Sequence, residues 1–341
     1  MLQHKLQSIR QAIRTNTYLD EAQSVEYMLN INPVSEDAQN SVHATALLFV
    51  QQCRANPDKQ GLFAAFLQEY SLSSQEGVVL MCLAEALLRV PDRDTVDCLI
   101  AEKIHMGQWE SHIGNSAEIL VNAASVGLSI TRKILANQQD IEIESKNWFA
   151  KLIQRLGEPV VRGATLQAMK FMGQQYVLGR DIKEASKRGR RGNVDGTRFS
   201  FDMLGEGART YETGAKYYAS YLSAIRSIGK GNHEKNVYAV DGISVKLSAL
   251  HPRYEFSRHQ LVMDELLPDV LALAVEAKKF NIGFTIDAEE AARLDIELDV
   301  FACLAFAPEL AGWNGLGFVL QAYQKRALSV VDWLVELAKS S

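Results

Sequence analysis

A lysine interrupts an apolar run in the sequence GISVKLSAL, which covers residues 242–250. Ile243, Val245 and Leu247 favour a buried strand. A lysine is almost never fully buried unless an anion pairs with it. Lys246 therefore predicts a site at which an anionic group is held.

Three further polar residues stand at comparable places in runs that are otherwise apolar: Glu206 in RFSFDMLGE, Asp287 in IGFTIDAEE and Gln321 in LGFVLQAYQ. All four lie at or just past the end of a strand-like run. A buried ion pair between Lys246 and Asp287 that only neutralises two charges is the structural alternative, and such pairs often add little stability. The repetition in four successive units favours a functional site.

The elements that carry these residues alternate in type after about residue 195. Each strand-like run is followed by a helical stretch, which predicts βα units, a parallel sheet and the α/β class. Lys246, Asp287 and Gln321 are 41 and 34 residues apart. They would still meet in one pocket, because the active site of a (β/α)8 barrel lies at the carboxyl ends of its strands.

The chain before these units is predicted to be helical. We expect an N-terminal helical arm over residues 1–56, an all-helical domain over 57–180, and the first four βα units of a (β/α)8 barrel over 181–341. In the second part, SLSSQEGVVLMCLAEALLRVPD predicts a capped helix. The basic run KEASKRGRRGN, residues 183–193, could contact nucleic acid or anionic lipid, but a solvated helix end is the favoured interpretation.

The composition limits the function classes. The 36 basic and 41 acidic residues give a net charge of −5, which is not the footprint of a general nucleic-acid binder. The most apolar stretch, VVLMCLAEALL, is about half a membrane span and contains Glu85, so it predicts no spanning helix but leaves surface association open. The four cysteines form no CxxC pair and fit a reducing cytosol, and the scattered histidines predict no metal site.

One glycine-rich motif could suggest a nucleotide site. GEGART, residues 205–210, follows a strand-like run and opens a helical stretch, as a dinucleotide-binding loop does. Its third glycine is missing, and no acidic residue closes a second strand at the expected distance. We interpret it as a loop that needs small residues.

Six longer stretches resemble one known family: SLSSQEGVVLMCLAEALLRVPD, SHIGNSAEILVNAASVGLSI, FSFDMLGEGA, ISVKLSALHPRY, FTIDAEEAARLD and GFVLQAYQKR. They are similar to the proline dehydrogenase part of the proline utilization A family over nearly the whole chain. The resemblance implies FAD in a (β/α)8 barrel and oxidation of L-proline to 1-pyrroline-5-carboxylate, with hydride transfer to flavin N5. It also implies electron transfer to a membrane quinone, as the first step of proline catabolism to glutamate.

The resemblance assigns roles to individual residues. Lys246 matches the lysine that meets the proline carboxylate, and Asp287 matches an aspartate beside flavin and substrate. Gln321 matches the glutamine that approaches the flavin ring, and Ala288 follows Asp287 in the same cofactor-binding motif. Glu206 matches an acidic residue that pairs with a substrate-binding arginine and gates the pocket.

The resemblance also implies a location and partners. We expect a cytoplasmic protein with peripheral inner-membrane association in the reduced state. A downstream NAD-dependent aldehyde dehydrogenase domain of the same polypeptide and a possible homodimer are the expected protein partners.

Two departures from the family qualify this interpretation. Some members begin with a ribbon-helix-helix domain, which this sequence lacks, so we expect no operator binding. Four βα units, about 145 residues, are present where a barrel needs about 250, so we expect a fragment with half the flavin site missing and doubtful activity alone. Two alternatives remain: a non-catalytic assembly piece and a DNA-binding regulator. Flavin binding would distinguish a proline dehydrogenase from the assembly piece.

Overall fold

The computed structural model describes residues 2–31, 34–55, 74, 77–79, 95, 177–190, 196–203 and 205–341. The chain divides into two compact units, residues 1–33 with 179–341 and residues 34–178. In the second unit the described residues include helix α3 (Glu36–Ala55). Of the helix predicted for SLSSQEGVVLMCLAEALLRVPD, the structure describes Ser74 and residues 77–79, which are helical, and the Ser74 hydroxyl accepts the backbone N–H of Gly77 at 3.0 Å. The rest of this helix and most of the helical domain predicted over 57–180 lie outside the described residues.

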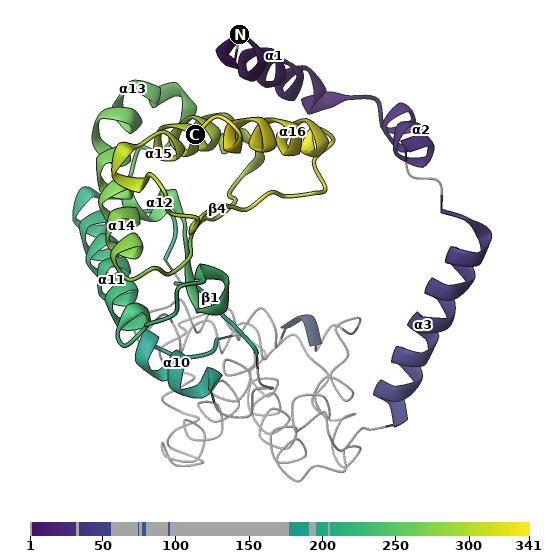
Figure 1. Cartoon of the computed structure of the whole chain (residues 1–341), viewed down its shortest axis with the longest axis horizontal. Helices are drawn as coiled ribbons and strands as arrows, with labels where there is room; N and C mark the ends of the chain where they lie inside the picture. Colours follow the sequence, from purple (N-terminus) through teal and green to yellow (C-terminus); the bar gives the residue numbers. More distant parts are fainter. Residues whose placement is uncertain are drawn as a thin grey trace, which may run out of the picture. The chain divides into compact units, whose positions relative to one another are not determined.

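The first unit begins with α1 (Leu2–Thr15), η1 (Asn16–Tyr18) and α2 (Glu21–Ile31). It continues with α10 (Ile182–Gly189) and then with strands and helices in alternation (Figure 1). The alternating elements are β1 (Ser200–Asp202), α11 (Tyr211–Gly229), β2 (Gly242–Val245), α14 (Leu267–Lys279), β3 (Phe284–Ile286), α15 (Leu294–Ala305), β4 (Leu316–Phe318) and α16 (Ala327–Ala338). Short helical turns in the connections are η4 (Val237–Ala239), α12 (Leu247–Leu250), η5 (Phe256–Arg258), α13 (His259–Leu261), η6 (Val262–Leu266), η7 (Ala291–Arg293) and η8 (Pro308–Leu310).

The four strands form one parallel sheet in the order β1-β2-β3-β4. Ile243 of β2 is in register with Phe201 of β1 and with Phe284 of β3. Ile243 and Phe284 are fully buried, as expected for strands of a parallel sheet that are covered on both faces. The parallel βα units expected from the sequence are therefore confirmed.

The second strand is shorter than the run GISVKLSAL suggested. β2 ends at Val245, and the residues after Lys246 form the helical turn α12. The backbone N–H of Lys246 donates to the hydroxyl of Tyr221 on α11, 3.3 Å away, rather than to a neighbouring strand. Leu247 is fully buried in the turn. Apolar residues therefore continue past the end of the strand, and periodicity alone cannot show where the strand stops.

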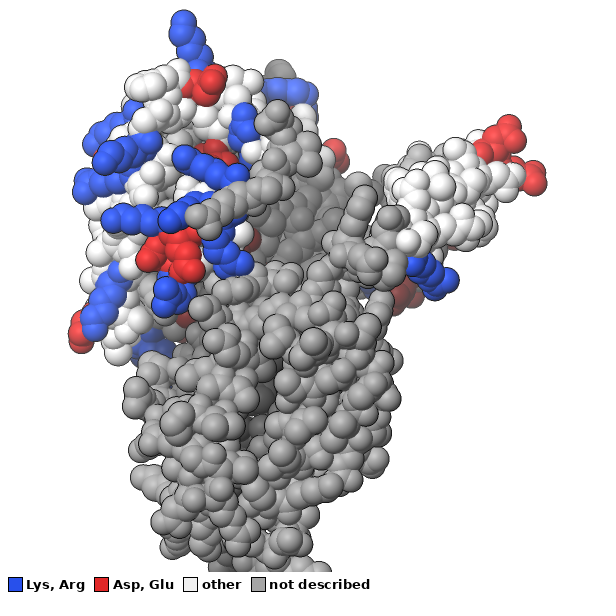
Figure 2. Space-filling view, turned by 90° about the horizontal axis from the view of Figure 1, so that it is seen from below, with Lys and Arg blue, Asp and Glu red and all other residues white. Residues whose placement is uncertain are grey.

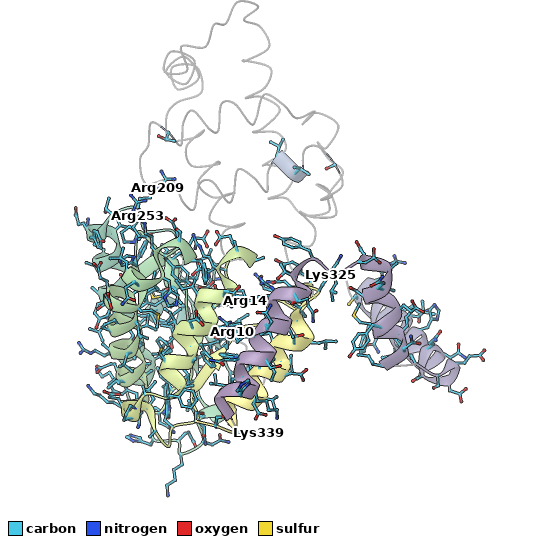
Figure 3. The ribbon with its side chains drawn as sticks, turned by 90° about the horizontal axis from the view of Figure 1, so that it is seen from above. Arg10, Arg14, Arg209, Arg253, Lys325 and Lys339 are labelled. Carbon is cyan, nitrogen blue, oxygen red and sulfur yellow. The ribbon has the colours of Figure 1, made fainter. Side chains whose placement is uncertain are left out.

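The N-terminal helix packs against the end of the chain. Ile13 of α1 is fully buried within the core of this unit. The ammonium of Lys5 lies 2.6 Å from Glu336 on α16, and Arg10 lies 2.7 Å from Asp299 on α15. Figure 3 shows α1 beside α16, with Arg10 on the side of α1 that meets the rest of the unit. Burial lowers the pKa of Arg10, although Asp299 and Asp295 oppose this effect.

Residues 183–189 of the basic run lie in α10. The Asp181 side chain caps this helix by accepting the backbone N–H groups of Lys183 and Glu184. Lys187 and Arg188 lie in its last turn, where cations offset the negative end of the helix dipole. Seen from the side on which α10 lies in Figure 1, Lys and Arg side chains surround a small group of carboxylates (Figure 2). Among the described helices, none is both long and apolar enough to cross a membrane.

Candidate active site at the carboxyl ends of the strands

Lys246 is held between two aspartates at the carboxyl ends of three adjacent strands. It directly follows β2, and Asp287 directly follows β3. Asp202 is the last residue of β1. The Lys246 ammonium lies 2.8 Å from both carboxylate oxygens of Asp202 and 2.7 Å from Oδ2 of Asp287. The structure thus brings Lys246 and Asp287 into contact, whereas their roles in a reaction remain predictions.

The charges at this site favour an ionised lysine. Burial alone lowers the pKa of Lys246, but hydrogen bonds to Asp202 and Asp287 outweigh burial and raise it above its ordinary value. The Lys246 side chain is 16% exposed, so an incoming molecule can still reach it. One ammonium between two carboxylates forms a site that can pair with both ends of a zwitterion.

Asp202 was missed by sequence reasoning. The polar residue predicted for the first unit is Glu206, four positions further along. β1 is only three residues long and ends at Asp202, so the first strand stops earlier than its apolar run suggested. The available signal was a carboxylate within FSFDML, in a strand that was expected to be buried on both faces.

The other predicted site residues lie in the neighbouring loops. Glu206 is exposed in the loop after β1. The backbone N–H of Ala288 donates to Oδ1 of Asp287, at 3.0 Å. Gln321 lies three residues beyond the end of β4, and its Oε1 accepts from Nε2 of Gln324 at 3.0 Å. The structure gives Gln321 no hydrogen bond to Lys246 or Asp287.

Ser248 ties three of these loops together. Its hydroxyl accepts the backbone N–H of Gly207 at 3.0 Å, and its carbonyl accepts that of Ala208 at 2.8 Å. Its own N–H donates to Oε1 of Glu289 at 2.9 Å. Ser248 is 3% exposed, so these bonds are shielded from water. The loop that carries Glu206 is therefore anchored to the loops that follow β2 and β3.

A pair of buried carboxyl groups lies beneath the loop that follows Asp287. Glu289 is 2.7 Å from the guanidinium of Arg293, and its backbone N–H donates to Oε1 of Glu297 at 3.2 Å. Glu297 is 2% exposed. Burial, followed by the charge of Glu289, raises the pKa of Glu297 to about 8. Glu297 therefore keeps a proton at neutral pH and supports the loop without adding a second negative charge there.

No metal site appears at this edge of the sheet. Within the residues that the structure describes, no group of three or more His, Cys, Asp or Glu side chains could hold a metal ion.

Three family models match successive parts of the chain. They are described as "Proline utilization A proline dehydrogenase N-terminal domain" for residues 7–54, "DNA-binding domain of Proline dehydrogenase" for 62–176, and "Proline dehydrogenase" for 185–341. The chain is also 44% identical to the bifunctional protein PutA of Escherichia coli K12 over 98% of its own length. The chain belongs to the proline utilization A family. The resemblance stated from the sequence motifs is thereby confirmed.

Two further matches are also to members of the proline utilization A family. The bifunctional protein PutA of Rhizobium meliloti is 42% identical over 98% of this chain and 27% of that protein. A crystal structure of a mutant of proline utilization A from Bradyrhizobium japonicum is 40% identical, with a TM-score of 0.62, and covers 95% of this chain and 32% of that one. The chain spans about a quarter of the length of the curated relatives, 26% for the Escherichia coli protein.

Proposed function

We propose that this chain contributes the substrate-binding lysine and part of the flavin site of a proline dehydrogenase that oxidises L-proline to 1-pyrroline-5-carboxylate. The observation that carries the proposal is the position of Lys246, between Asp202 and Asp287 at the carboxyl ends of adjacent parallel strands. This is the end at which (β/α)8 enzymes place their active sites. We further propose that the four βα units are the first half of such a barrel.

The charges of the site suit free proline, which is a zwitterion at neutral pH. Lys246 would bind the substrate carboxylate through a charge-assisted hydrogen bond. Asp202 and Asp287, which share Lys246 in this structure, would accept N–H groups from the substrate's ammonium. A ligand with only one of the two charges would leave part of the site unpaired.

FAD is the proposed cofactor, and the residues present fit part of it. The side-chain oxygen of Gln321 accepts hydrogen bonds from Gln324 and Tyr323, whereas its nitrogen has no partner in the described part of the chain. Gln321 can therefore donate to an acceptor atom of a flavin ring, and Asp287 and Ala288 would border the cofactor from the next loop. When bound, the flavin would accept the hydride from the carbon beside the proline nitrogen.

The remaining features of the proposal come from the family. They are gating of the pocket by Glu206, electron transfer to a membrane quinone, and a cytoplasmic location with peripheral inner-membrane association. A fused NAD-dependent aldehyde dehydrogenase domain and a homodimer are proposed on the same basis. The alternative, a non-catalytic assembly piece of the same enzyme, predicts no flavin binding.

Flavin reduction tests the proposal. The protein for this test is a chimaera that joins this chain to the carboxyl-terminal part of a relative, mixed with FAD. We expect its flavin absorbance to bleach when L-proline is added in the absence of air. D-proline serves as the control, because its carboxylate and hydrogen cannot both occupy the same positions. Bleaching by the 341-residue chain itself would show that these four units suffice. No bleaching with the joined chain would overturn the proposed function.

We also predict that this chain does not bind operator DNA. The family model for residues 62–176 is described as a DNA-binding domain, so the prediction needs a direct test. It rests on the net charge of −5 and on the lack of a ribbon-helix-helix motif in this sequence. The measurement is a gel shift at two salt concentrations. Specific binding that weakens steeply with salt would contradict the prediction.

A further inference from the structure

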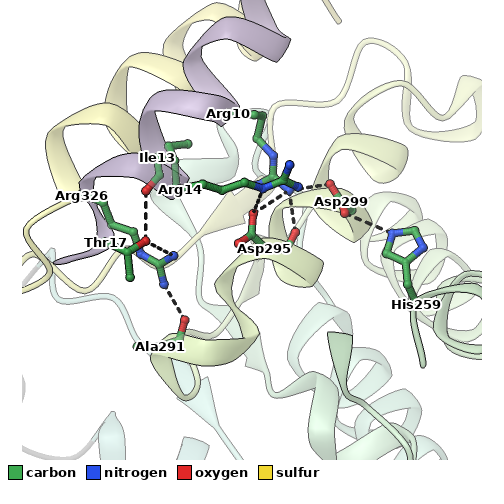
Figure 4. A network of polar contacts seen from close by, with 9 residues as sticks. All are labelled: Arg10, Ile13, Arg14, Thr17, His259, Ala291, Asp295, Asp299 and Arg326. Atoms are coloured by element: carbon green, nitrogen blue, oxygen red, sulfur yellow. Dashed lines mark hydrogen bonds and ion pairs between the residues drawn. The ribbon is translucent and has the colours of Figure 1, made fainter. Parts of the chain in front are cut away.

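Arg326 is a buried arginine whose hydrogen bonds go to uncharged oxygens. It is 4% exposed and lies just before α16. Its guanidinium donates to Oε1 of Gln324 at 2.8 Å, to Oγ1 of Thr17 at 3.3 Å and to the backbone oxygen of Ala291. Figure 4 shows Arg326 between Thr17 and Ala291. No ion pair joins it to a carboxylate within the described residues, so neutralisation of a charge does not explain its burial.

Helix capping does not explain Arg326 either. It occupies the N-cap position of α16, and its side chain caps no backbone N–H there. The amino end of a helix carries a partial positive charge, so a cation at this place is unfavourable. The first turn of α16 has no acidic residue that would offset it. The position of Arg326 therefore calls for another reason.

The guanidinium of Arg326 determines which atoms donate and which accept in the hydrogen bonds of Gln324 and Gln321. A guanidinium only donates, so Gln324 must turn its side-chain oxygen toward Arg326. This leaves the Gln324 nitrogen to donate to Oε1 of Gln321 at 3.0 Å. The hydroxyl of Tyr323 donates to the same oxygen at 3.3 Å. The amide of Gln321 is thereby fixed with its oxygen inside the loop and its N–H groups available.

We propose that Arg326 is a positioning residue that acts through Gln324 to make Gln321 a hydrogen-bond donor toward its ligand. The direction of the amide follows from the contacts alone. Only the identity of that ligand, a flavin ring, rests on the proposed function. Without Arg326 both glutamine amides could turn by half a rotation at little cost, because an amide can donate or accept at either end.

The short segment that follows α1, from Asn16 to Leu19, holds the start of this relay in place. The Thr17 hydroxyl donates to the backbone oxygen of Ile13 at 3.3 Å and so keeps a lone pair for Arg326. The Lys325 ammonium donates to the backbone oxygen of Leu19 at 2.6 Å, and Asn16 donates to the hydroxyl of Ser329 at 3.0 Å. Residues more than 300 positions away in the sequence thus fix the loop that carries Gln321.

Two substitutions of Gln324 test the relay. Gln324→Glu keeps an acceptor for Arg326 but cannot donate to Gln321, and its carboxylate would accept from the Gln321 nitrogen instead. Gln324→Met keeps the length of the side chain and removes both hydrogen bonds. Gln23→Glu, at an exposed position of α2, adds the same charge elsewhere and is the matched control.

The first readout is the side-chain amide resonance of Gln321 in ¹⁵N-labelled chain, assigned by its loss in Gln321→Leu. In Gln324→Glu we expect its N–H protons to shift and to exchange with water several-fold more slowly, because the carboxylate now binds them. In Gln324→Met we expect a shift without slower exchange, and in Gln23→Glu no change. An unchanged Gln321 resonance in both Gln324 variants would overturn the relay.

The second readout is the affinity for FAD, measured by quenching of flavin fluorescence. Loss or reversal of one directed hydrogen bond predicts a fall of about ten-fold in both Gln324 variants and none in Gln23→Glu. A fall in Gln324→Glu alone would show an effect of the added charge and would contradict the proposal. If the unaltered chain binds no FAD, the proposed cofactor fails for this chain, while the amide resonance still decides whether the relay exists.

Discussion

Lys246→Met weakens the binding of L-proline by about ten- to a hundred-fold in a chimaera that joins this chain to the carboxyl-terminal part of a relative. A hydrogen bond to a charged group contributes about 1.5–3 kcal/mol, and methionine offers neither charge nor donor. Asp202 and Asp287 would also lose the cation that they share, so their charges would repel the substrate carboxylate. We therefore expect the loss mainly in proline affinity rather than in the rate at saturation.

The measurement is the dependence of flavin reduction on proline concentration. Lys216→Met is the matched control, because Lys216 is an exposed lysine on α11 that also pairs with a carboxylate, Glu212 at 2.7 Å. It should leave proline affinity unchanged. Unchanged proline affinity in Lys246→Met would remove Lys246 from the substrate site and leave it as the centre of a structural ion pair.

Glu297→Gln makes the fold more stable at pH 8 than the unaltered chain, and about equally stable at pH 4.5. Burial, with the charge of Glu289, raises the pKa of Glu297 to about 8 in the folded chain, against about 4.5 when unfolded. Between these values the folded state binds the extra proton, so the free energy of unfolding falls as pH rises. Glutamine is neutral throughout and keeps an oxygen for the N–H of Glu289.

The expected difference at pH 8 is on the order of 2 kcal/mol, obtained by discounting the full shift for relaxation of the folded chain. It is measured by urea unfolding at pH 4.5, 6 and 8. Glu309→Gln is the control, because Glu309 is exposed and the same substitution should leave the pH dependence intact. If the stabilities of Glu297→Gln and of the unaltered chain fall equally as the pH rises, Glu297 does not hold this proton.

The sequence predicted the βα units because each strand is a short apolar run followed by a helical period. Ile243 and Phe284 illustrate why this works: both are fully buried, so their apolar character reflects their position directly. The pairing of Lys246 with Asp287 followed from the same rule, since parallel strands end at one edge of the sheet. The ends of the strands were harder to place, because Leu247 is as apolar and as buried as the strand before it.

The parts that sequence reasoning missed depend on contacts between distant segments. Asp202 reads as part of a strand until the strand is seen to end there. Nothing local to Arg326 shows that Thr17 and Ala291 supply its acceptors, because these residues lie 309 and 35 positions away. Glu297 lies within a helical stretch, and its proton depends on how closely Glu289 and the surrounding core cover it.

The docking of α1 on α16 has a consequence for synthesis of the chain. Lys5 and Glu336 are 331 residues apart, so α1 leaves the ribosome long before its binding face on α16 has been made. At about 5–20 residues per second, this delay lasts roughly 20 to 70 s. During that time Leu6, Ile9 and Ile13, which pack into the core of the finished unit, have no native partner. The nascent chain should therefore present α1 as a chaperone-binding helix, and release of α1 would report the completion of α16.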